Sequence, residues 1–115
     1  MSVKGDDVFM RILVFFDLPV NKTEQRRVAT RFRKDLIDDW YTMLQFSVYC
    51  RVCKGQDIVD RQIKRLKKII PEEGNVRVLQ VTDKQYGSML FLVGEQKKEE
   101  KFGAEQLLLF WFSKI

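Results

Sequence analysis

Carboxylates and basic side chains are the groups in this sequence that could do chemistry, because its 115 residues include no histidine. That absence excludes Ser-His-Asp and Cys-His catalysis and also His-ligated metal sites. Asp17 is the most informative carboxylate, since it ends the apolar run 12–16 and is followed two positions later by Pro19. One carboxylate binds Mg²⁺ weakly, but two that a two-fold axis brings together could share an ion. Asp17 is therefore a candidate metal ligand, and a turn-initiating acid is the alternative interpretation.

Basic residues form the second group that could bind a partner. The net charge is +5, and residues 26–34 carry five basic side chains with no acid among them. A face of this kind suits phosphates bound without sequence specificity, although an ordinary solvated face is the alternative. Three of the five follow one flank of an expected helix, and the other two are expected opposite its core; the candidates are Arg26, Arg27, Arg31, Arg33 and Lys34.

Ser47 and the cysteines carry weaker signals. The Ser47 hydroxyl could hold a phosphate or a metal-bound water, and a hairpin serine is the alternative. Cys50 and Cys53 form a C-x-x-C motif, but no other Cys and no His remain to complete a zinc site. They lie in an extended run, where positions three apart face opposite sides, so they are interpreted as ordinary cysteines of a reducing compartment.

The elements that position these groups alternate in type along the chain. Apolar periodicity and turn residues predict a strand at 9–18, a helix at 23–39, two short strands within 41–53, a helix at 57–70, and strands at 76–82 and 89–93. One long bent strand is the alternative for residues 41–53. This order predicts an α+β, ferredoxin-like β-α-β-β-α-β domain with an added fifth strand. We place the domain at 1–94 and a charged linker with an apolar tail at 95–115.

The first strand also predicts a partner. Both of its faces are apolar, but two helices can cover only one face of a sheet, so we expect a homodimer with facing sheets. The tail is expected either to add as a strand to a partner's sheet edge or to fold back on its own domain. No apolar run is long enough to span a membrane, which makes the cytoplasm the expected location.

Four stretches in order resemble a known family: RILVFFDLP, RRVATRFRKDLI, QFSVYCRV and VRVLQVTDKQYGSMLFLVGE. The chain resembles the small CRISPR-associated adaptation protein that partners the CRISPR integrase, in systems with a single-protein RNA-guided nuclease. The resemblance implies a ferredoxin-like homodimer in which Asp17 of both protomers binds Mg²⁺ or Mn²⁺ near the dimer axis. Asp17 matches the family's acid and Ser47 the serine of its S-V-[FY] motif, and both are candidate catalytic residues. Gln25 and Met43 replace basic residues of some nuclease-active members, which weakens the nuclease interpretation.

The resemblance implies two alternative functions. The first is spacer acquisition, in which the dimer binds duplex DNA and bridges integrase dimers for insertion into the CRISPR array. The second is metal-dependent endonuclease activity on RNA or DNA. A toxin-like or regulatory RNA binder of the same fold is a third interpretation. The tail residues expected to dock on the integrase or within the dimer are Leu107, Leu108, Leu109, Phe110, Trp111 and Phe112.

Overall fold

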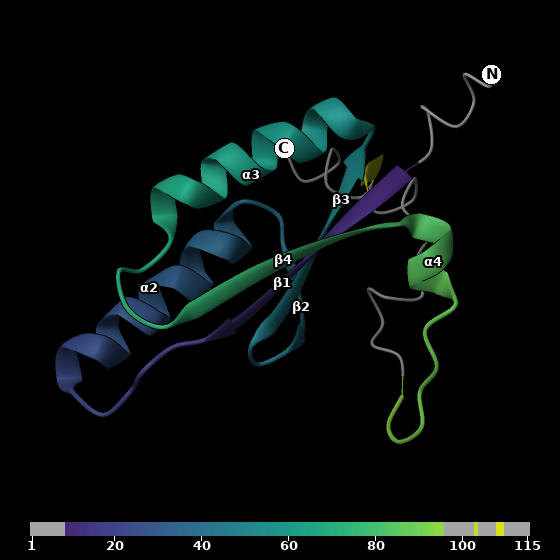
Figure 1. Ribbon diagram of the computed structural model, residues 1–115. Coiled ribbons are helices and arrows are strands. Elements are labelled where there is room, and N and C mark those ends of the chain that lie inside the picture. The colour runs from purple at the N-terminus through teal and green to yellow at the C-terminus, as the bar shows by residue number, and fades with distance from the viewer. Residues whose placement is uncertain (1–8, 96–102, 104–107, 110–115) are drawn as a thin grey trace.

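The fold was taken from a computed structural model that describes residues 9–95, 103 and 108–109. Four strands form one antiparallel sheet in the order β2-β3-β1-β4, and the helices α2 and α3 lie together on one of its faces (Figure 1). The elements in chain order are β1 (Phe9–Asp17), α2 (Thr23–Asp38), β2 (Thr42–Gln45), β3 (Val48–Lys54), α3 (Gln56–Ile69), β4 (Asn75–Thr82) and α4 (Asp83–Gly87). The α+β, ferredoxin-like order is confirmed. No helix in this described part is long and apolar enough to cross a membrane.

The main core lies between the sheet and the two long helices. Alternate residues of β1 point toward the helices, and Ile12, Val14 and Phe16 are buried there. The ring of Phe16 meets that of Phe32 from α2 edge to face, with 5.0 Å between the ring centroids. Such edge-to-face pairs stabilise a core beyond the area they bury. The register of β1 is therefore fixed, because a slip of one residue would turn this row outward.

The other face of the sheet is covered in part by the chain itself. The helix α4 packs Tyr86 against Leu13 and Cys50, and all three side chains are buried. Arg11 is buried beneath the same helix, where its Nε donates to Asp83 at 2.7 Å and its guanidinium lies 4.1 Å from the centre of the Tyr86 ring. The ion pair and the ring contact hold α4 on this face. One chain thus supplies part of the cover that the sequence assigned to a second copy.

Two short strands in the region 41–53 are confirmed, and a tight turn at Phe46 and Ser47 joins β2 to β3. The hydrogen-bond ladder between β1 and β3 extends to the residue before β3 begins, since the amide of Phe16 donates to the carbonyl of Ser47 at 3.0 Å. The turn therefore lies beside the end of β1.

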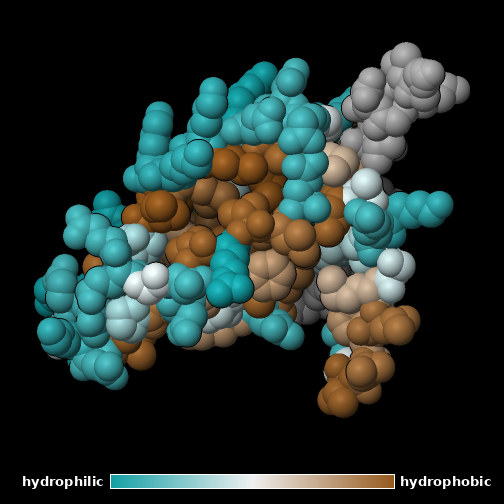
Figure 2. Space-filling view, viewed as in Figure 1, coloured by the Kyte–Doolittle hydropathy of each residue, from teal (hydrophilic) through white to brown (hydrophobic). Residues whose placement is uncertain are grey.

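The fifth strand expected at 89–93 is wrong, because these residues form no strand in the structure. A strand needs a neighbouring edge, and after α4 the chain leaves the sheet (Figure 1). Leu90, Leu92 and Val93 are 82–92% exposed, and Figure 2 shows this hydrophobic loop projecting from the molecule. We call residues 89–93 the apolar loop.

The structure describes two of the tail residues, and the expected addition of the tail to a partner's sheet edge stays a prediction. Leu108 and Leu109 have helical rather than extended backbone. Consecutive large apolar residues suit a helix as well as a strand, so a short run of them does not distinguish the two. The other tail residues, and most of the proposed 95–115 segment, lie outside the described residues.

Candidate functional site

Asp17 is the last residue of β1, and its side chain is exposed. It belongs to the row of β1 residues that alternates with the buried row beneath the helices, so its carboxylate lies on the sheet face opposite α2 and α3. Phe15, which is 36% exposed, belongs to the same row. The structure thus presents Asp17 on the face where a facing sheet would meet it.

Residues of β4 complete the surroundings of Asp17. Asn75 is its direct partner across the β1–β4 ladder, so the two side chains share a face. Arg77 lies two residues further on, and its Nε donates to the Asn75 Oδ1 at 2.9 Å. The carboxylate, the amide and the guanidinium together form a polar cluster at this end of the sheet face. The sequence analysis missed Asn75, because only the strand register brings it beside Asp17.

Gly74 fixes the backbone at this site. Its φ of +96° belongs to the left-handed region that glycine tolerates best. A Cβ added there would lie 2.7 Å from the carbonyl oxygen of Asp17 and 2.9 Å from a methyl group of Leu18. Only glycine lets the turn before β4 approach the end of β1 so closely.

Ser47 lies near Asp17 through its backbone rather than through its hydroxyl. Its carbonyl accepts from the amide of Phe16, the residue before Asp17. Tyr49 from the same motif belongs to the core and has its ring centroid 5.6 Å from that of Phe16. Burial raises the pKa of the Tyr49 phenol, while the positive charge of Arg33 opposes that rise. Tyr49 is therefore a packing residue here.

The ligand chemistry available to a metal ion in one chain is limited. Among the residues that the structure describes, no group of three or more His, Cys, Asp or Glu side chains could hold an ion. Asp17 contributes one carboxylate, and one carboxylate cannot surround a metal ion with protein ligands. Mg²⁺ needs few protein ligands, because it keeps several waters and takes substrate phosphate oxygens. Two copies of Asp17 would fit an ion of this kind better than one copy, which would hold it only weakly.

A shallow hollow on the outer face of α2 collects four of the five basic candidates. It is lined entirely by basic and threonine side chains: Thr23, Arg26, Arg27, Thr30, Arg31 and Lys34. We call these residues the basic hollow. Cationic and hydroxyl groups are the donors that proteins most often direct at phosphate oxygens. The structure thus places Arg27, Arg31 and Lys34 on one surface, as their spacing indicated, and Arg26 joins them there.

Each base in this hollow has a local partner. Arg27 lies 3.7 Å from Glu24, Arg31 lies 3.9 Å from Asp35, and Lys34 lies 2.8 Å from Asp38. The Asp38 carboxylate raises the pKa of Lys34 above its ordinary value. Exposed helical pairs contribute little to stability, so a phosphate could displace them. The acids that flank the run at 26–34 thus moderate its positive charge without removing it.

Arg26 differs from the other bases of the hollow, because it stabilises the loop before α2. Its guanidinium donates to the carbonyls of Val20 and Asn21 at 3.1 and 3.2 Å and to the Thr23 hydroxyl at 3.1 Å. Part of its hydrogen-bonding capacity is therefore already used. A substitution of Arg26 would disturb the loop as well as the charge.

The expected position of Arg33 opposite the core is wrong. Arg33 turns from the basic hollow toward the sheet, where its guanidinium lies 3.7 Å from the centre of the Phe46 ring and 5.3 Å from that of Phe16. Its Nε also donates to the carbonyl of Phe46 at 3.3 Å. The 3.6-residue period places Arg33 between the outer and core faces of α2, and contact with aromatic rings decides its direction.

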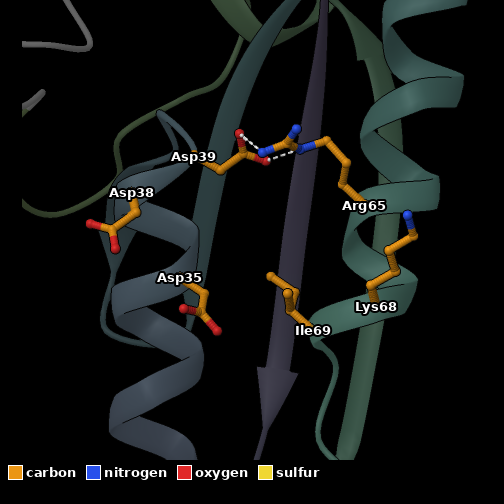
Figure 3. Close-up of a pocket in the computed structure, with 6 residues that line it drawn as sticks. All are labelled: Asp35, Asp38, Asp39, Arg65, Lys68 and Ile69. Atoms are coloured by element: carbon orange, nitrogen blue, oxygen red, sulfur yellow. Dashed lines mark hydrogen bonds and ion pairs between the residues drawn. The ribbon is translucent and has the colours of Figure 1, made fainter.

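A second hollow lies between α2 and α3, lined by Asp35, Asp38, Asp39, Arg65, Lys68 and Ile69. Figure 3 shows Asp39 and Arg65 facing each other across it, joined by two contacts of 3.0 Å. Asp38 points away from this pair in the same view. The bidentate pair joins the two helices, so this hollow is best explained as a structural contact.

Cys50 and Cys53 are free and buried. They lie on opposite faces of the sheet, so they do not form a C-x-x-C site on one surface. Cys53 packs with Ile12 beneath the helices, whereas Cys50 packs with Leu13 on the other face. Burial raises the pKa of the Cys50 thiol to about 11 and also raises that of Cys53. Neither thiol is ionised at neutral pH, which suits packing better than catalysis.

Comparison with known proteins identifies relatives over most of the chain. The family model of the CRISPR associated protein Cas2 matches residues 10–89. A protein of Acidovorax ebreus named CRISPR-associated endoribonuclease Cas2 is 50% identical over 102 residues, which cover 88% of this chain and 100% of the relative. Proteins of the same name from Flavobacterium psychrophilum and Campylobacter jejuni are 42% and 44% identical. These matches cover 86% and 87% of this chain and 86% and 70% of those relatives.

Proposed function

The chain belongs to the CRISPR-associated Cas2 family, and we propose that it acts in spacer acquisition as a dimeric adaptor that binds duplex DNA and bridges dimers of the CRISPR integrase. The single observation that carries this proposal is the basic hollow on α2. Its donors lie on an exposed helix and suit contacts to a phosphate backbone. Free thiols at Cys50 and Cys53 agree with work in the reducing cytoplasm.

The proposed dimer pairs the sheet faces that carry Asp17. Support comes from the apolar residues that one chain leaves open there: Phe15 is 36% exposed and Leu79 on β4 is 51% exposed. The apolar loop adds further exposed hydrophobic area, which monomeric proteins rarely leave in water. A dimer would present two basic hollows to one duplex.

In this proposal the tail residues Leu107–Phe112 dock on the integrase, and deletion of residues 106–115 should abolish integrase binding while leaving a folded dimer.

Salt dependence of DNA binding tests the adaptor proposal. The variant Arg27→Gln/Arg31→Gln/Lys34→Gln removes three charges from the basic hollow and spares Arg26, which stabilises a loop. Each lost phosphate contact should reduce the slope of log K against log salt concentration by about 0.9. We expect weaker binding and a shallower slope for any duplex sequence, measured by fluorescence anisotropy.

A matched control removes three exposed charges from α3 instead, as Arg61→Gln/Lys64→Gln/Lys67→Gln. It changes the net charge equally but leaves the hollow intact, so its binding should stay close to that of the wild type. Equal losses in both triple variants would contradict a specific role for α2 and would indicate a general effect of net charge.

A second candidate function is metal-dependent cleavage of RNA or DNA. It is favoured by the exposed carboxylate of Asp17 beside Asn75 and Arg77, and the relatives described above are named endoribonucleases. A bound Mg²⁺ or Mn²⁺ would polarise a phosphoryl oxygen and activate a water. Asp17 of each protomer would hold the ion in the dimer. Arg77, now bonded to Asn75, would neutralise charge on a phosphate, and the Ser47 hydroxyl is the group expected to orient that phosphate.

Metal dependence and an Asp17 variant separate the two functions. Cleavage by this site should require Mg²⁺ or Mn²⁺ and should disappear in Asp17→Ala. Because Asp17 is exposed, the variant should remain as stable as the wild type in urea. Cleavage that survives the substitution would point to a contaminating nuclease. The adaptor proposal predicts that Asp17→Ala still supports spacer acquisition.

A further inference from the structure

The turn between β2 and β3 carries an unusual aromatic side chain. Phe46 is 68% exposed, although turn positions usually hold small or polar residues. The guanidinium of Arg33 lies 3.7 Å from the ring centre. A flat cation at this distance covers one face of the ring, so the solvent-accessible part includes the remaining face.

The Arg33 guanidinium is held in place from two sides. Its Nε donates to the carbonyl of Phe46 at 3.3 Å, and the buried ring of Phe16 lies 5.3 Å behind it. Phe46, Arg33 and Phe16 therefore form a layered stack that extends from the core to the surface. A stack of this kind fixes the orientation of the outer ring before any partner binds.

The stack lies close to both candidate sites. Phe46 is followed by Ser47, whose carbonyl bonds the amide of Phe16, so the turn borders the end of β1 at Asp17. Arg33 belongs to α2, the helix whose outer face forms the basic hollow. A strand of nucleic acid that contacts α2 through its phosphates could reach Phe46 with a base.

We propose that Phe46, supported by Arg33, is a stacking position for an unpaired nucleobase. The cationic and aromatic character of the stack matches a base attached to a phosphodiester, and every base has a π-face to offer. Paired bases inside a duplex are not available for such contact, so the position distinguishes a single-stranded end from a blunt one. The proposal rests on the nucleic-acid binding proposed above and adds to it a preference for unpaired ends.

Binding to two DNA probes tests the proposal with the full chain. One probe is a blunt duplex, and the other is the same duplex with a short 3′ overhang that contains 2-aminopurine. Loss of one base–aromatic contact weakens binding by about 5- to 150-fold. Phe46→Leu keeps an apolar side chain but removes the ring. It should lower affinity for the overhang probe by at least about fivefold and abolish quenching of the 2-aminopurine, while affinity for the blunt probe is unchanged.

Two further variants control for folding and for lost apolar surface. Phe46→Trp keeps an aromatic face and should retain both the overhang preference and the quenching. Ile70→Ala removes apolar surface that is 45% exposed at the C-cap of α3, an element that contributes no residue to the stack, and should behave as the wild type. Circular dichroism checks that every variant is folded.

The possible outcomes separate this inference from the proposed function. Equal affinity of the wild type for both probes, or a Phe46→Leu variant that still quenches 2-aminopurine, would overturn the stacking position and leave duplex binding in place. Failure of the wild type to bind either probe would overturn both proposals.

Discussion

At the scale of single residues, the neighbours of each side chain decide its role more than its type does. Asp17 and Asp83 are both carboxylates near strand ends, but Asp83 pairs with the buried Arg11 at 2.7 Å whereas Asp17 stays exposed. Burial acts to lower the pKa of Arg11, but the hydrogen bond to Asp83 and the nearby Cys50 sulfur raise it overall. The Asp83 carboxylate helps to hold α4 on the sheet through its ion pair with Arg11, whereas Asp17 remains available for a ligand.

Cys50 gives a prediction about pH at this scale. Burial raises the pKa of its thiol from 9.0 to about 11, so in this interval the folded protein keeps a proton that the unfolded chain loses. Its contribution to stability is complete below pH 9 and is lost as the pH rises through about 11. The loss is at most about 2–3 kcal/mol in the free energy of unfolding.

Urea unfolding at pH 8 to 11 measures this loss. The free energy of unfolding of Cys50→Ala should fall less steeply with pH than that of the wild type, even if the variant is less stable at pH 8. Some slope should remain, because burial also raises the pKa values of Tyr41 and Cys53. Identical slopes in the two proteins would show that Cys50 is not the titrating group.

At the scale of elements, the junction of β1 and β4 positions the candidate site. Gly74→Ala should be destabilising by about 2 kcal/mol or more, because alanine is strained at a φ of +96° and its Cβ would meet the Asp17 carbonyl. Gly87→Ala is the matched control, since a Cβ there meets nothing within 4 Å. Alanine in α4 should be neutral or stabilising by about 0.5–1 kcal/mol.

Chemical denaturation of both variants checks this prediction. A Gly74→Ala variant as stable as Gly87→Ala would show that the approach of Gly74 to β1 is not needed for folding. The position of Asp17 beside Asn75 would then not depend on this turn.

The elements could largely be predicted from the sequence, because apolar periodicity identifies long, amphipathic helices and buried strands. The helix α2 and both strands of the β2–β3 hairpin were expected close to their observed bounds. The apolar loop was not, since its composition suits a strand but the chain leaves the sheet after α4 and residues 89–93 pair with neither edge strand. Strand pairing also limited how much of the candidate site could be predicted from the sequence. Asp17 could be chosen from its position after an apolar run, but Asn75 becomes its neighbour only through the β1–β4 register.

The basic candidates show the same limit on one helix. Arg27, Arg31 and Lys34 share a surface because their spacing follows the helical period. Arg33 could not be assigned in this way, since aromatic rings that are distant along the chain draw it toward the sheet. Spacing predicts which residues share a face, but it does not predict which neighbours compete for a side chain.

At the scale of the whole molecule, exposed apolar area is the feature that one chain leaves unexplained. Leu92 in the apolar loop is 90% exposed, and Figure 2 shows that hydrophobic surface also lies around β4. We expect the protein to be a dimer at micromolar concentration, and we expect Leu92→Glu to weaken that dimer because it would bury a charge at the interface.

Sedimentation equilibrium measures the association. Val20→Glu places the same charge on another exposed apolar residue, 51% exposed, in the loop before α2, and should leave the dimer intact. A monomeric wild type, or a Leu92→Glu variant that associates as tightly as the wild type, would rule out the apolar loop as part of a dimer interface.

The most direct test of the adaptor function is reconstitution with the CRISPR integrase on a short duplex DNA, with insertion into a CRISPR array as the readout. The wild type, Asp17→Ala and the triple variant of the basic hollow are compared at matched concentrations. We predict that Asp17→Ala supports insertion as the wild type does and that the triple variant does not. Full insertion by the triple variant, together with loss of insertion in Asp17→Ala, would contradict the adaptor function and favour a nuclease.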